Sequence, residues 1–412
     1  MHKFLQIAAL TAGLALSAAP ALAQTTLTFP SWQTEDKVFQ PWWQAVIAEF
    51  EAKHPDVKIE MSNIPFNQYV DQLTVQFAGG NPPDIVHLPA RNFGQFAENG
   101  WLAPLDDMLA QTDIPKTWNP MQQGMVWNGQ TEGVLLMGYG YVLFYNQALL
   151  DKAGITAVPK TVDELIADAQ KITNKDAGIF GFGGVTTEHP NVSAELSNWI
   201  LSQGADPLKD GKYNFTDPAV IAAVDKYREA YKQAAPGLNS TQLNQIFIDG
   251  KVGFMIAGPF AWPAFKGADG KQMADARMAL LPFPKTAGGM SNSLHLSATT
   301  DPEKQKLAWE FIRTAAEPKF QEMYTEMTYS PASRQGALTP ETIASNPVLK
   351  TVNDAAVGAI DVFPTIPAVR AAYNDYSTAL TQAGIRLQTT SDPTATVMGD
   401  LQNELQQRIP LN

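Results

Sequence analysis

Adjacent carboxylates are the side chains of this chain that could do chemistry at short spacing. Glu35-Asp36 and Asp106-Asp107 are two such pairs. Hydrolysis of a glycosidic bond needs two carboxylates that face the same bond. Neighbouring residues point apart in a helix or a strand, so neither pair marks a catalytic centre. We therefore expect the protein not to be an enzyme.

The chain also lacks the short motifs that other active sites need. It has no Gly-x-Ser-x-Gly, no His-Glu-x-x-His and no Gly-x-Gly-x-x-Gly after a strand, and Gly250-Lys251 lacks the upstream glycine of a phosphate-binding loop. There is no cysteine, and the histidines after the leader region lie far apart in sequence, which argues against a metal site. These are His54, His87, His189 and His295. We expect no metal ion and no cofactor.

The N-terminal segment has the three parts of a signal peptide. Met1-His-Lys3 is positively charged, residues 4–16 form an apolar run too short to span a bilayer, and Ala21-Leu-Ala23 is a small-residue cleavage signal. We expect residues 1–23 to be removed by cleavage after Ala23. Because there is no cysteine to lipidate at the new N-terminus, we expect a soluble periplasmic protein.

Net charge and length narrow the class of protein further. The 412 residues carry a formal net charge of −12. This acidic balance argues against nucleic acid and anionic membrane surfaces as partners. The fold cannot use disulfides, but a chain of this length can bury a sufficient core in two or three domains.

Strands and amphipathic helices alternate along the first part of the chain. Residues 26–30, 57–61 and 84–88 predict strands, and the apolar spacing of residues 42–50 and 66–77 predicts helices between them. This order predicts an α/β fold with a mostly parallel sheet covered by helices.

The same alternation returns in the second part. Residues 141–145 and 252–256 predict strands. Thr161 with Glu164 forms a capping-box pattern, and Asp217-Pro218 and Asp301-Pro302 each place a cap residue before a proline in the first helical turn. No low-complexity linker separates the two parts, so strands or brief crossings must join two α/β lobes.

Four segments carry a resemblance to a known family. They are residues 77–105 around Gly-Gly-Asn-Pro-Pro-Asp84, residues 143–165 beginning Leu-Phe-Tyr-Asn, residues 247–260 ending Ala-Gly-Pro-Phe, and residues 328–334 ending Ser-Pro-Ala-Ser-Arg. In this order they resemble blocks of family 1 extracellular solute-binding proteins of ABC importers, and they are similar to maltose-binding and multiple-sugar-binding proteins. The resemblance covers almost the whole chain after residue 23.

This resemblance implies a fold and a partner. The fold is the type II periplasmic-binding-protein clamshell, in which two lobes, each a mostly parallel sheet flanked by helices, are joined by multiple crossings. Matching segments place residues 24–137 and 293–345 in lobe 1, and residues 138–292 and 346–412 in lobe 2. A solute enters the cleft, the lobes close by a hinge motion, and the closed form docks on the transmembrane subunits of an ABC permease. We expect a monomer.

The resemblance also implies a carbohydrate, a mono- to oligosaccharide, as the ligand. A pyranose packs its apolar face on an aromatic ring, and its hydroxyls pair with polar side chains. Side chains of both kinds stand at strand ends, at the inferred crossings and at positions that match ligand loops. They are Trp32, Gln33, Arg91, Asn92, Tyr139, His189, Asn191, Trp262, Asn292, His295, Arg370 and Tyr373.

Two positions depart from the pattern of maltose-binding relatives. Arg91 and Asn92 align with two sugar-contacting positions, one of which is acidic in those relatives. An arginine there changes the donor pattern, so the alternative ligand is an anionic solute such as glycerol 3-phosphate or a sugar acid. Phe260 replaces the tryptophan of the family's Gly-Pro-Trp, and we expect Trp262 to supply the stacking surface. A secreted carbohydrate-active enzyme is the less favoured alternative.

Overall fold

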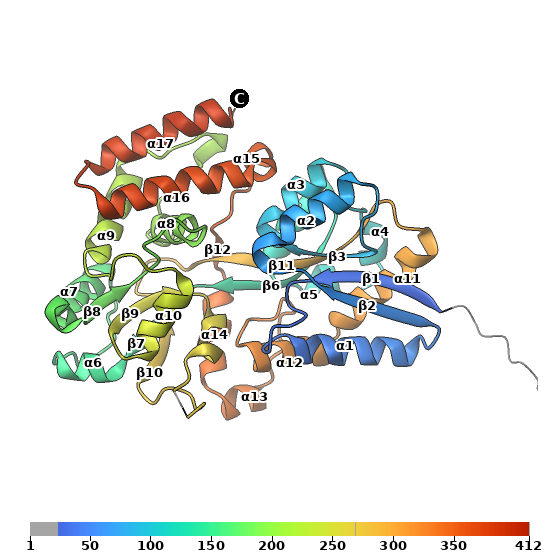
Figure 1. Ribbon diagram of the computed structural model, residues 1–412, viewed down its shortest axis with the longest axis horizontal. Helices are drawn as coiled ribbons and strands as arrows, with labels where there is room; N and C mark the ends of the chain where they lie inside the picture. Colours follow the sequence, from blue (N-terminus) through green and yellow to red (C-terminus); the bar gives the residue numbers. More distant parts are fainter. Residues whose placement is uncertain (1–23, 268, 412) are drawn as a thin grey trace, which may run out of the picture.

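The computed structural model describes residues 24–411 except residue 268, and the predicted signal peptide lies outside the described residues. Helices and strands form two lobes on either side of a central strand pair, β6 (Val134–Gly140) and β11 (Ala287–Leu296) (Figure 1). We call the part that contains β1 to β3 the first lobe and the part that contains β7 to β10 the second lobe. None of the described helices is long and apolar enough to cross a membrane.

The first lobe contains three strands and the helices packed around them. These are β1 (Thr25–Ser31), α1 (Gln40–Lys53), β2 (Val57–Asn63), α2 (Phe66–Ala78), β3 (Ile85–Pro89), α3 (Phe93–Glu98), α11 (Pro302–Ala315) and α12 (Pro318–Thr328). β1 and β2 pair in parallel, and α1 connects them. Trp42 and Trp43 lie on the buried face of α1, as its apolar spacing predicts. All three strands and both helices predicted between residues 26 and 88 are present.

The second lobe is built on a four-stranded sheet with the order β10-β7-β9-β8. Its elements are α6 (Gln147–Lys152), β7 (Val142–Asn146), α7 (Val162–Ile172), β8 (Phe180–Gly183), α8 (Asn191–Ser202), α9 (Pro218–Tyr231), α10 (Ser240–Ile248), β9 (Val252–Ala257) and β10 (Ala276–Leu280). β8 and β9 are parallel, but β7 is antiparallel to both of its neighbours. The expectation of a mostly parallel sheet therefore does not hold here, because β7 lies between two strands that run in the opposite direction and only the pair β8–β9 of this sheet is parallel.

The predicted helix starts are present and explain where three helices begin. The carboxylate of Asp217 accepts from the N–H of Ala219 at 2.8 Å, and that of Asp301 accepts from Glu303 at 2.9 Å. At α7 the Thr161 hydroxyl accepts from the N–H of Glu164 at 3.2 Å. The Glu164 carboxylate returns to the N–H of Lys160 rather than to that of Thr161.

The strand pair β6 and β11 carries the chain between the lobes. Gly288 of β11 pairs with both Asp361 of β12 (Ile360–Asp361) and Gly140 of β6. Asn292 pairs with both Pro89 of β3 and Met137 of β6. A strand has two edges, so β6 occupies one edge of β11, and β12 and β3 share the other.

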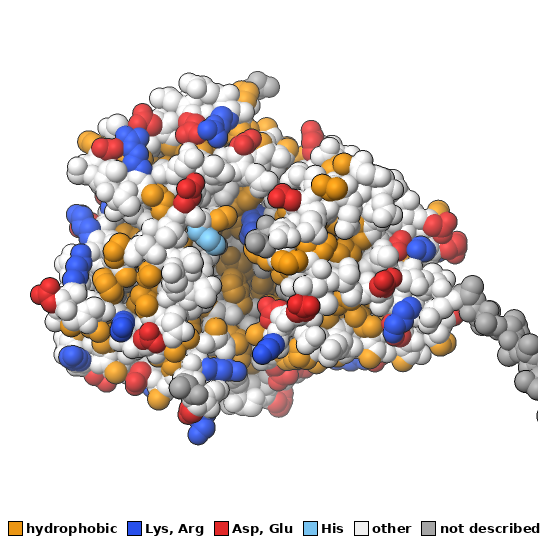
Figure 2. Space-filling view, in the orientation of Figure 1, with side chains coloured by type: hydrophobic (Ala, Val, Ile, Leu, Met, Phe, Trp, Pro, Cys, Tyr) orange, Lys and Arg blue, Asp and Glu red, His pale blue; other side chains and the backbone are white. Residues whose placement is uncertain are grey.

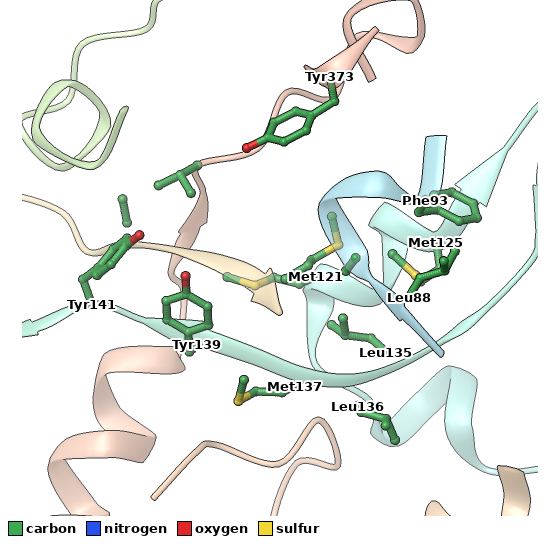
Figure 3. Packing of buried hydrophobic residues seen from close by; sticks show 14 of the residues in the cluster. Leu88, Phe93, Met121, Met125, Leu135, Leu136, Met137, Tyr139, Tyr141 and Tyr373 are labelled. Carbon is green, nitrogen blue, oxygen red and sulfur yellow. The ribbon is translucent and has the colours of Figure 1, made fainter. Parts of the chain in front are cut away.

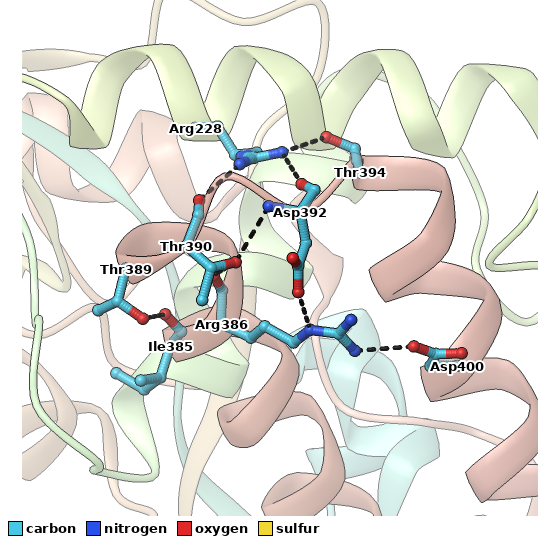
Figure 4. Close-up of polar contacts among 8 residues, drawn as sticks. All are labelled: Arg228, Ile385, Arg386, Thr389, Thr390, Asp392, Thr394 and Asp400. Atoms are coloured by element: carbon cyan, nitrogen blue, oxygen red, sulfur yellow. Dashed lines mark hydrogen bonds and ion pairs between the residues drawn. The ribbon is translucent and has the colours of Figure 1, made fainter.

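The C-terminal helices α16 (Tyr373–Thr389) and α17 (Thr394–Arg408) cover the second lobe and are joined by a charged turn (Figure 4). Arg386 binds the carboxylates of Asp392 at 2.6 Å and Asp400 at 2.8 Å. Arg228 of α9 donates to the carbonyls of Asp392 at 2.7 Å and Thr390 at 2.9 Å. These contacts fix the end of the chain to the body of the second lobe.

Short elements make up the remaining connections. They are η1 (Ala90–Asn92), α4 (Asp106–Leu109), α5 (Ile114–Thr117), η2 (Pro120–Met125), β4 (Val126–Trp127), β5 (Gln130–Thr131), η3 (Lys175–Ala177), η4 (Lys209–Gly211), η5 (Pro259–Ala264), α13 (Pro340–Ser345), α14 (Val348–Ala356) and α15 (Pro367–Ala371).

Candidate ligand-binding site

Between the lobes, strand pairing along one edge of β11 is interrupted, and we call this stretch the floor of the cleft. β12 pairs with Ala287 and Gly288, and β3 pairs from Asn292 onward. Residues 289–291 lie between them, and no described strand pairs with them on this edge. The ends of β3 and β12 therefore face each other across a short gap, and the molecular surface is hollowed between the lobes (Figure 2).

An aromatic surface with one cation borders the gap on the first-lobe side. Phe66 and Tyr69 of α2 meet the indole of Trp32 edge-on, with ring centroids 5.6 and 4.8 Å away. Arg91, in the turn that follows β3, places its guanidinium 5.4 Å from the centre of the Phe66 ring. Phe66 is 50% exposed, so Trp32, Phe66 and Arg91 offer apolar area and hydrogen-bond donors side by side.

The ring of Trp32 stacks on the buried ring of His87. The ring centroids are 4.0 Å apart, and the interplanar angle is 12°. His87 Nδ1 lies 2.9 Å from the hydroxyl oxygen of Ser31, at the end of β1. Burial lowers the pKa of His87 to about 3, so the imidazole is neutral at physiological pH. The stack orients Trp32 without adding a charge to the site.

Three tyrosines gather on the second-lobe side (Figure 3). Tyr139 and Tyr141 lie at the end of β6, with ring centroids 5.4 Å apart. The hydroxyl of Tyr373 points toward these two residues. Phe260, which is 40% exposed, meets the ring of Tyr139 edge-on at 5.2 Å. A phenol both donates and accepts, so this cluster can pair with the hydroxyls of a solute.

Burial and nearby charges shift the pKa values of these groups. Burial raises the pKa of Tyr139 to about 12, while Arg91 lowers it and Asp361 raises it by smaller amounts. Burial likewise raises the pKa of Tyr373, and it lowers the pKa of His189. The strand register places Tyr139 and Asp361 at the gap, opposite Gly289 and Gly288 of β11.

Several predicted site residues lie near the gap, and their roles as ligand contacts stay predictions. Tyr139 pairs with Gly289 of β11, Arg91 follows the end of β3, and Trp32 adjoins Arg91 through Phe66. His189 and Tyr373 are the other predicted residues on the second-lobe side. Asn191 adjoins the group, since its N–H donates to His189 Nδ1 at 3.1 Å, but its side chain donates to Ser240 at 2.8 Å.

Two predicted contacts are engaged inside the first lobe. His295 is fully buried, with Nδ1 2.6 Å from the carbonyl of Glu132 and Nε2 2.7 Å from the hydroxyl of Ser293. Gln33 is 3% exposed, and its Oε1 accepts from the indole N–H of Trp43 at 2.9 Å. Both side chains serve packing, so we do not retain them among the proposed ligand contacts.

The two predicted asparagines are also buried. Asn292 is 1% exposed and donates to the hydroxyl of Tyr324 at 3.4 Å. Asn92 is 4% exposed and donates to the side chain of Asn374 at 3.4 Å, which ties the turn after β3 to the start of α16. Asn92 thus positions the neighbouring Arg91, whereas Asn292 belongs to the core beneath the floor.

Trp262 does not take over the stacking position. It is 7% exposed and stacks on Phe144 of β7 in the second-lobe core, with centroids 6.2 Å apart. Phe260 keeps the position at the cleft, next to Tyr139. The expectation for Trp262 is corrected because the 3-10 turn η5 points the residue two places after Phe260 into the lobe.

Arg370 binds protein rather than the open cleft. It donates to the carbonyls of Gly124 and, at 3.4 Å, Val126. Its guanidinium lies 5.0 Å from the ring centre of Phe93 and 5.6 Å from that of Trp127. α15, which the sequence assigns to the second lobe, therefore packs against α3 of the first lobe.

Sequence reasoning missed several residues of the site. The spacing of residues 66–77 predicts a buried stripe that includes Phe66, but at the first position of α2 this side chain is 50% exposed. Asp361 and Phe363 follow no recognisable motif. Tyr141 packs on Tyr139, and only its closeness to Tyr139 in sequence could have indicated its place. Glu195 accepts from the hydroxyl of Tyr231 and from the N–H of Val185 at 3.2 Å, and burial raises the pKa of this carboxyl to about 8.

No described residues form a group of three or more His, Asp or Glu side chains that could hold a metal ion. The groups around the gap are phenols, aromatic rings, one guanidinium and carboxyl groups. They can hydrogen-bond and stack against a polar organic solute, and none is arranged as a nucleophile with its base.

The family model of the bacterial extracellular solute-binding proteins matches residues 36–322. The chain belongs to this family. A putative binding protein of Brucella abortus is 28% identical over 227 residues, which are 53% of this chain and 55% of that protein. The chain thus matches about half the length of this relative. The diacetylchitobiose-binding protein DasA of Streptomyces coelicolor is 26% identical over 298 residues, 68% of this chain and 67% of that protein.

Solved structures share the fold over nearly the whole chain. A solute-binding protein of an ABC transporter from Thermotoga lettingae, bound with α-D-tagatose, superposes with a TM-score of 0.80 and 21% identity. The superposition covers 93% of this chain and 99% of that protein. The predicted two-lobed α/β clamshell of the periplasmic binding proteins is confirmed.

Proposed function

We propose that this protein captures a carbohydrate, a mono- to oligosaccharide, between its lobes and delivers it to the membrane permease of an ABC importer. The observation that carries the proposal is the gap in the edge of β11. Aromatic rings border it on both sides, with Trp32 and Phe66 on one lobe and Tyr139 and Phe260 on the other. Two apolar walls with hydroxyl and charged groups between them suit the two faces of a sugar ring.

Relatives support this choice of ligand class. The Streptomyces protein is named for diacetylchitobiose, and the Thermotoga structure contains tagatose. Capture by binding, without chemical conversion, agrees with membership in a solute-binding family. We further propose that the protein acts as a soluble periplasmic monomer after cleavage at Ala23.

The lobes extend the proposal to a motion. We propose that residues 24–137 and 293–345 move as one lobe and residues 138–292 and 346–412 as the other. The β6–β11 ladder is irregular between Met290 and Ser293, where its register shifts. A bulged ladder bends more easily than a regular one, so closure would concentrate there.

Thermal-shift screening tests the proposal. A solute that binds only the folded protein raises the melting temperature by mass action. We expect a shift with at least one sugar from a panel of maltotriose, N,N′-diacetylchitobiose and D-tagatose. A response to glycerol 3-phosphate or D-glucuronate, with none to neutral sugars, would favour the anionic alternative.

A further inference from the structure

Asp361 is a carboxylate at the gap whose hydrogen-bonding capacity is only partly used. It is the last residue of β12 and is half-buried. Its Oδ1 accepts from the N–H of Phe363 at 2.9 Å. The N–H of Met290, in the stretch 289–291 of β11, also binds this carboxylate. No described side chain donates a hydrogen bond to it, so the remaining acceptor positions of the carboxylate are available to a group that enters the cleft.

Neither nearby arginine is paired with Asp361. The positive charge of Arg370 acts on it, but the guanidinium donates to the carbonyls of Gly124 and Val126. Arg91 contacts the Phe66 ring and, within the described chain, lies within 4.0 Å of no carboxylate. A carboxyl group therefore stands at the end of β12 and a guanidinium just after the end of β3, at the two ends of the gap in the edge of β11.

Two tyrosines lie near this gap. Tyr139 pairs with Gly289 in the same stretch of β11, and Tyr373 packs at 5.6 Å on Phe363, two residues after Asp361. A neutral diol can donate a hydroxyl to the carboxylate and accept from the guanidinium at the same time. An anionic group cannot use the carboxylate, and it meets a like charge in a site partly removed from water.

We propose that Asp361 determines the charge selectivity of the cleft: it binds hydroxyl groups of a neutral sugar and, by offsetting Arg91, excludes anionic solutes. This inference rests on the proposed function and specifies its substrate class as uncharged polyhydroxyl compounds. Phe363, whose N–H binds Asp361 Oδ1 at 2.9 Å, packs edge-on against Tyr373 at 5.6 Å, which ties the turn after β12 to α16.

The test uses Asp361→Asn in the full protein. Asparagine retains an acceptor for the Phe363 N–H but removes the charge. Asp206→Asn is the matched control, because Asp206 makes the same local bond to the N–H of Leu208 at 2.9 Å on the exposed surface. Burial raises the pKa of Asp361 to about 7, so calorimetric titrations are run at pH 8, where the carboxylate is ionised.

The probes are maltotriose, N,N′-diacetylchitobiose and D-tagatose as neutral sugars, with D-glucuronate and glycerol 3-phosphate as anions. We expect Asp361→Asn to weaken binding of the neutral sugar by about 10- to 100-fold and to strengthen binding of an anionic probe, with Asp206→Asn unchanged. Asp361→Glu, which keeps the charge, should still exclude the anions. Titrations well below each variant's melting temperature separate affinity from folding.

Asp361→Asn could weaken binding of the neutral sugar without strengthening binding of an anion, or strengthen anion binding alone. Either result overturns the charge-selectivity role of Asp361, as does equal binding by wild type and Asp361→Asn. A wild type that binds an anion but no neutral sugar also contradicts it, while leaving solute capture in place. A wild type that binds none of the five probes contradicts the proposed carbohydrate function itself.

Discussion

The guanidinium of Arg370 lies 5.0 Å from the ring centre of Phe93, across the junction between α15 and α3. The backbone of Arg370 also packs closely against α3. A Cβ added to Gly94 of this helix would lie 2.8 Å from the Cβ of Arg370 and 2.9 Å from its carbonyl carbon. The C-terminal segment therefore touches the first lobe before it returns to the second as α16. This non-covalent contact joins the lobes in addition to the crossings of the chain itself.

Arg370→Lys should loosen this connection. Lysine cannot reproduce the planar group that stacks on Phe93 and donates to two carbonyls, so we expect the free energy of unfolding to fall by about 1–3 kcal/mol. Urea unfolding followed by circular dichroism would measure the change. Arg313→Lys is the control, because Arg313 makes only an exposed pair with Glu310. Equal stability of both variants would show that the contact is energetically neutral.

Local patterns in the sequence predicted the elements but not the direction of every side chain. Apolar spacing placed α1 and β3 correctly, because both are buried on the faces that the spacing defines. Phe66, which the spacing places in a buried stripe, is exposed, whereas Trp262, which we expected at the cleft, is buried in the second lobe. Whether an aromatic residue at the end of an element faces solvent depends on the lobe packed beyond it, and that packing is not encoded in local spacing.

Charged residues at the site show the same limit. Asp361 lies 270 residues after Arg91 in sequence. They lie at the two ends of one gap only because β12 and β3 use the same edge of β11. Contacts between residues so far apart in sequence depend on how the strands pair. The four segments that resemble the family imply the order of the strands in outline, but they do not give the residue-by-residue register of the pairing.

Trp32→Ala and Trp262→Ala should have opposite effects. Removing Trp32 should weaken sugar binding by about 1–3 kcal/mol with little loss of stability, because its ring lies at the cleft. Removing Trp262 should destabilise the fold by about 3–5 kcal/mol and leave the affinity of the folded protein unchanged. Titration calorimetry and thermal unfolding of both variants would separate the two roles. Loss of affinity in Trp262→Ala well below its melting temperature would return that residue to the site.

Stability should decline on the acidic side of neutral pH through the buried histidines. Burial lowers the pKa of His295 to about 4 and that of His87 to about 3, below the usual value of 6.5. A lowered pKa contributes stability that is complete above pH 6.5 and is lost as the pH falls toward 4. His295→Gln should reduce the difference in melting temperature between pH 7 and pH 4.5. An undiminished difference would assign the acid sensitivity to other groups.

Glu195 should make the protein less stable as the pH rises, opposite to the effect of the histidines. Burial raises its folded-state pKa to about 8 from 4.5, so its contribution is present at low pH and is lost as the pH rises through 8. Glutamine can still accept from the Tyr231 hydroxyl and the Val185 N–H that the carboxylate binds. We expect Glu195→Gln to gain at least about 1.4 kcal/mol of stability relative to wild type at pH 8.5. The exposed Glu303→Gln is the control and should show no such gain.

Ligand binding should compact the molecule. If the lobes close over a sugar at the gap in β11, the radius of gyration falls, and small-angle scattering at saturating ligand would record the decrease. Arg370→Ala should shift the scattering of the free protein toward a more open form, because it removes the contact between the Arg370 side chain and α3. A profile that is the same with and without bound sugar would contradict closure.

Arg91→Gln separates neutral from anionic ligands. Glutamine keeps one amide donor, so a neutral sugar should lose only modest affinity and show little dependence on salt. If Arg91 instead pairs with a carboxylate or phosphate, the same change leaves a buried anion unpaired, and the loss should reach about 3–5 kcal/mol. Calorimetric titrations at low and high salt, with Arg313→Gln as the exposed control, distinguish the two. We expect the modest loss, because the carboxyl group of Asp361 lies at the other end of the same gap in the edge of β11.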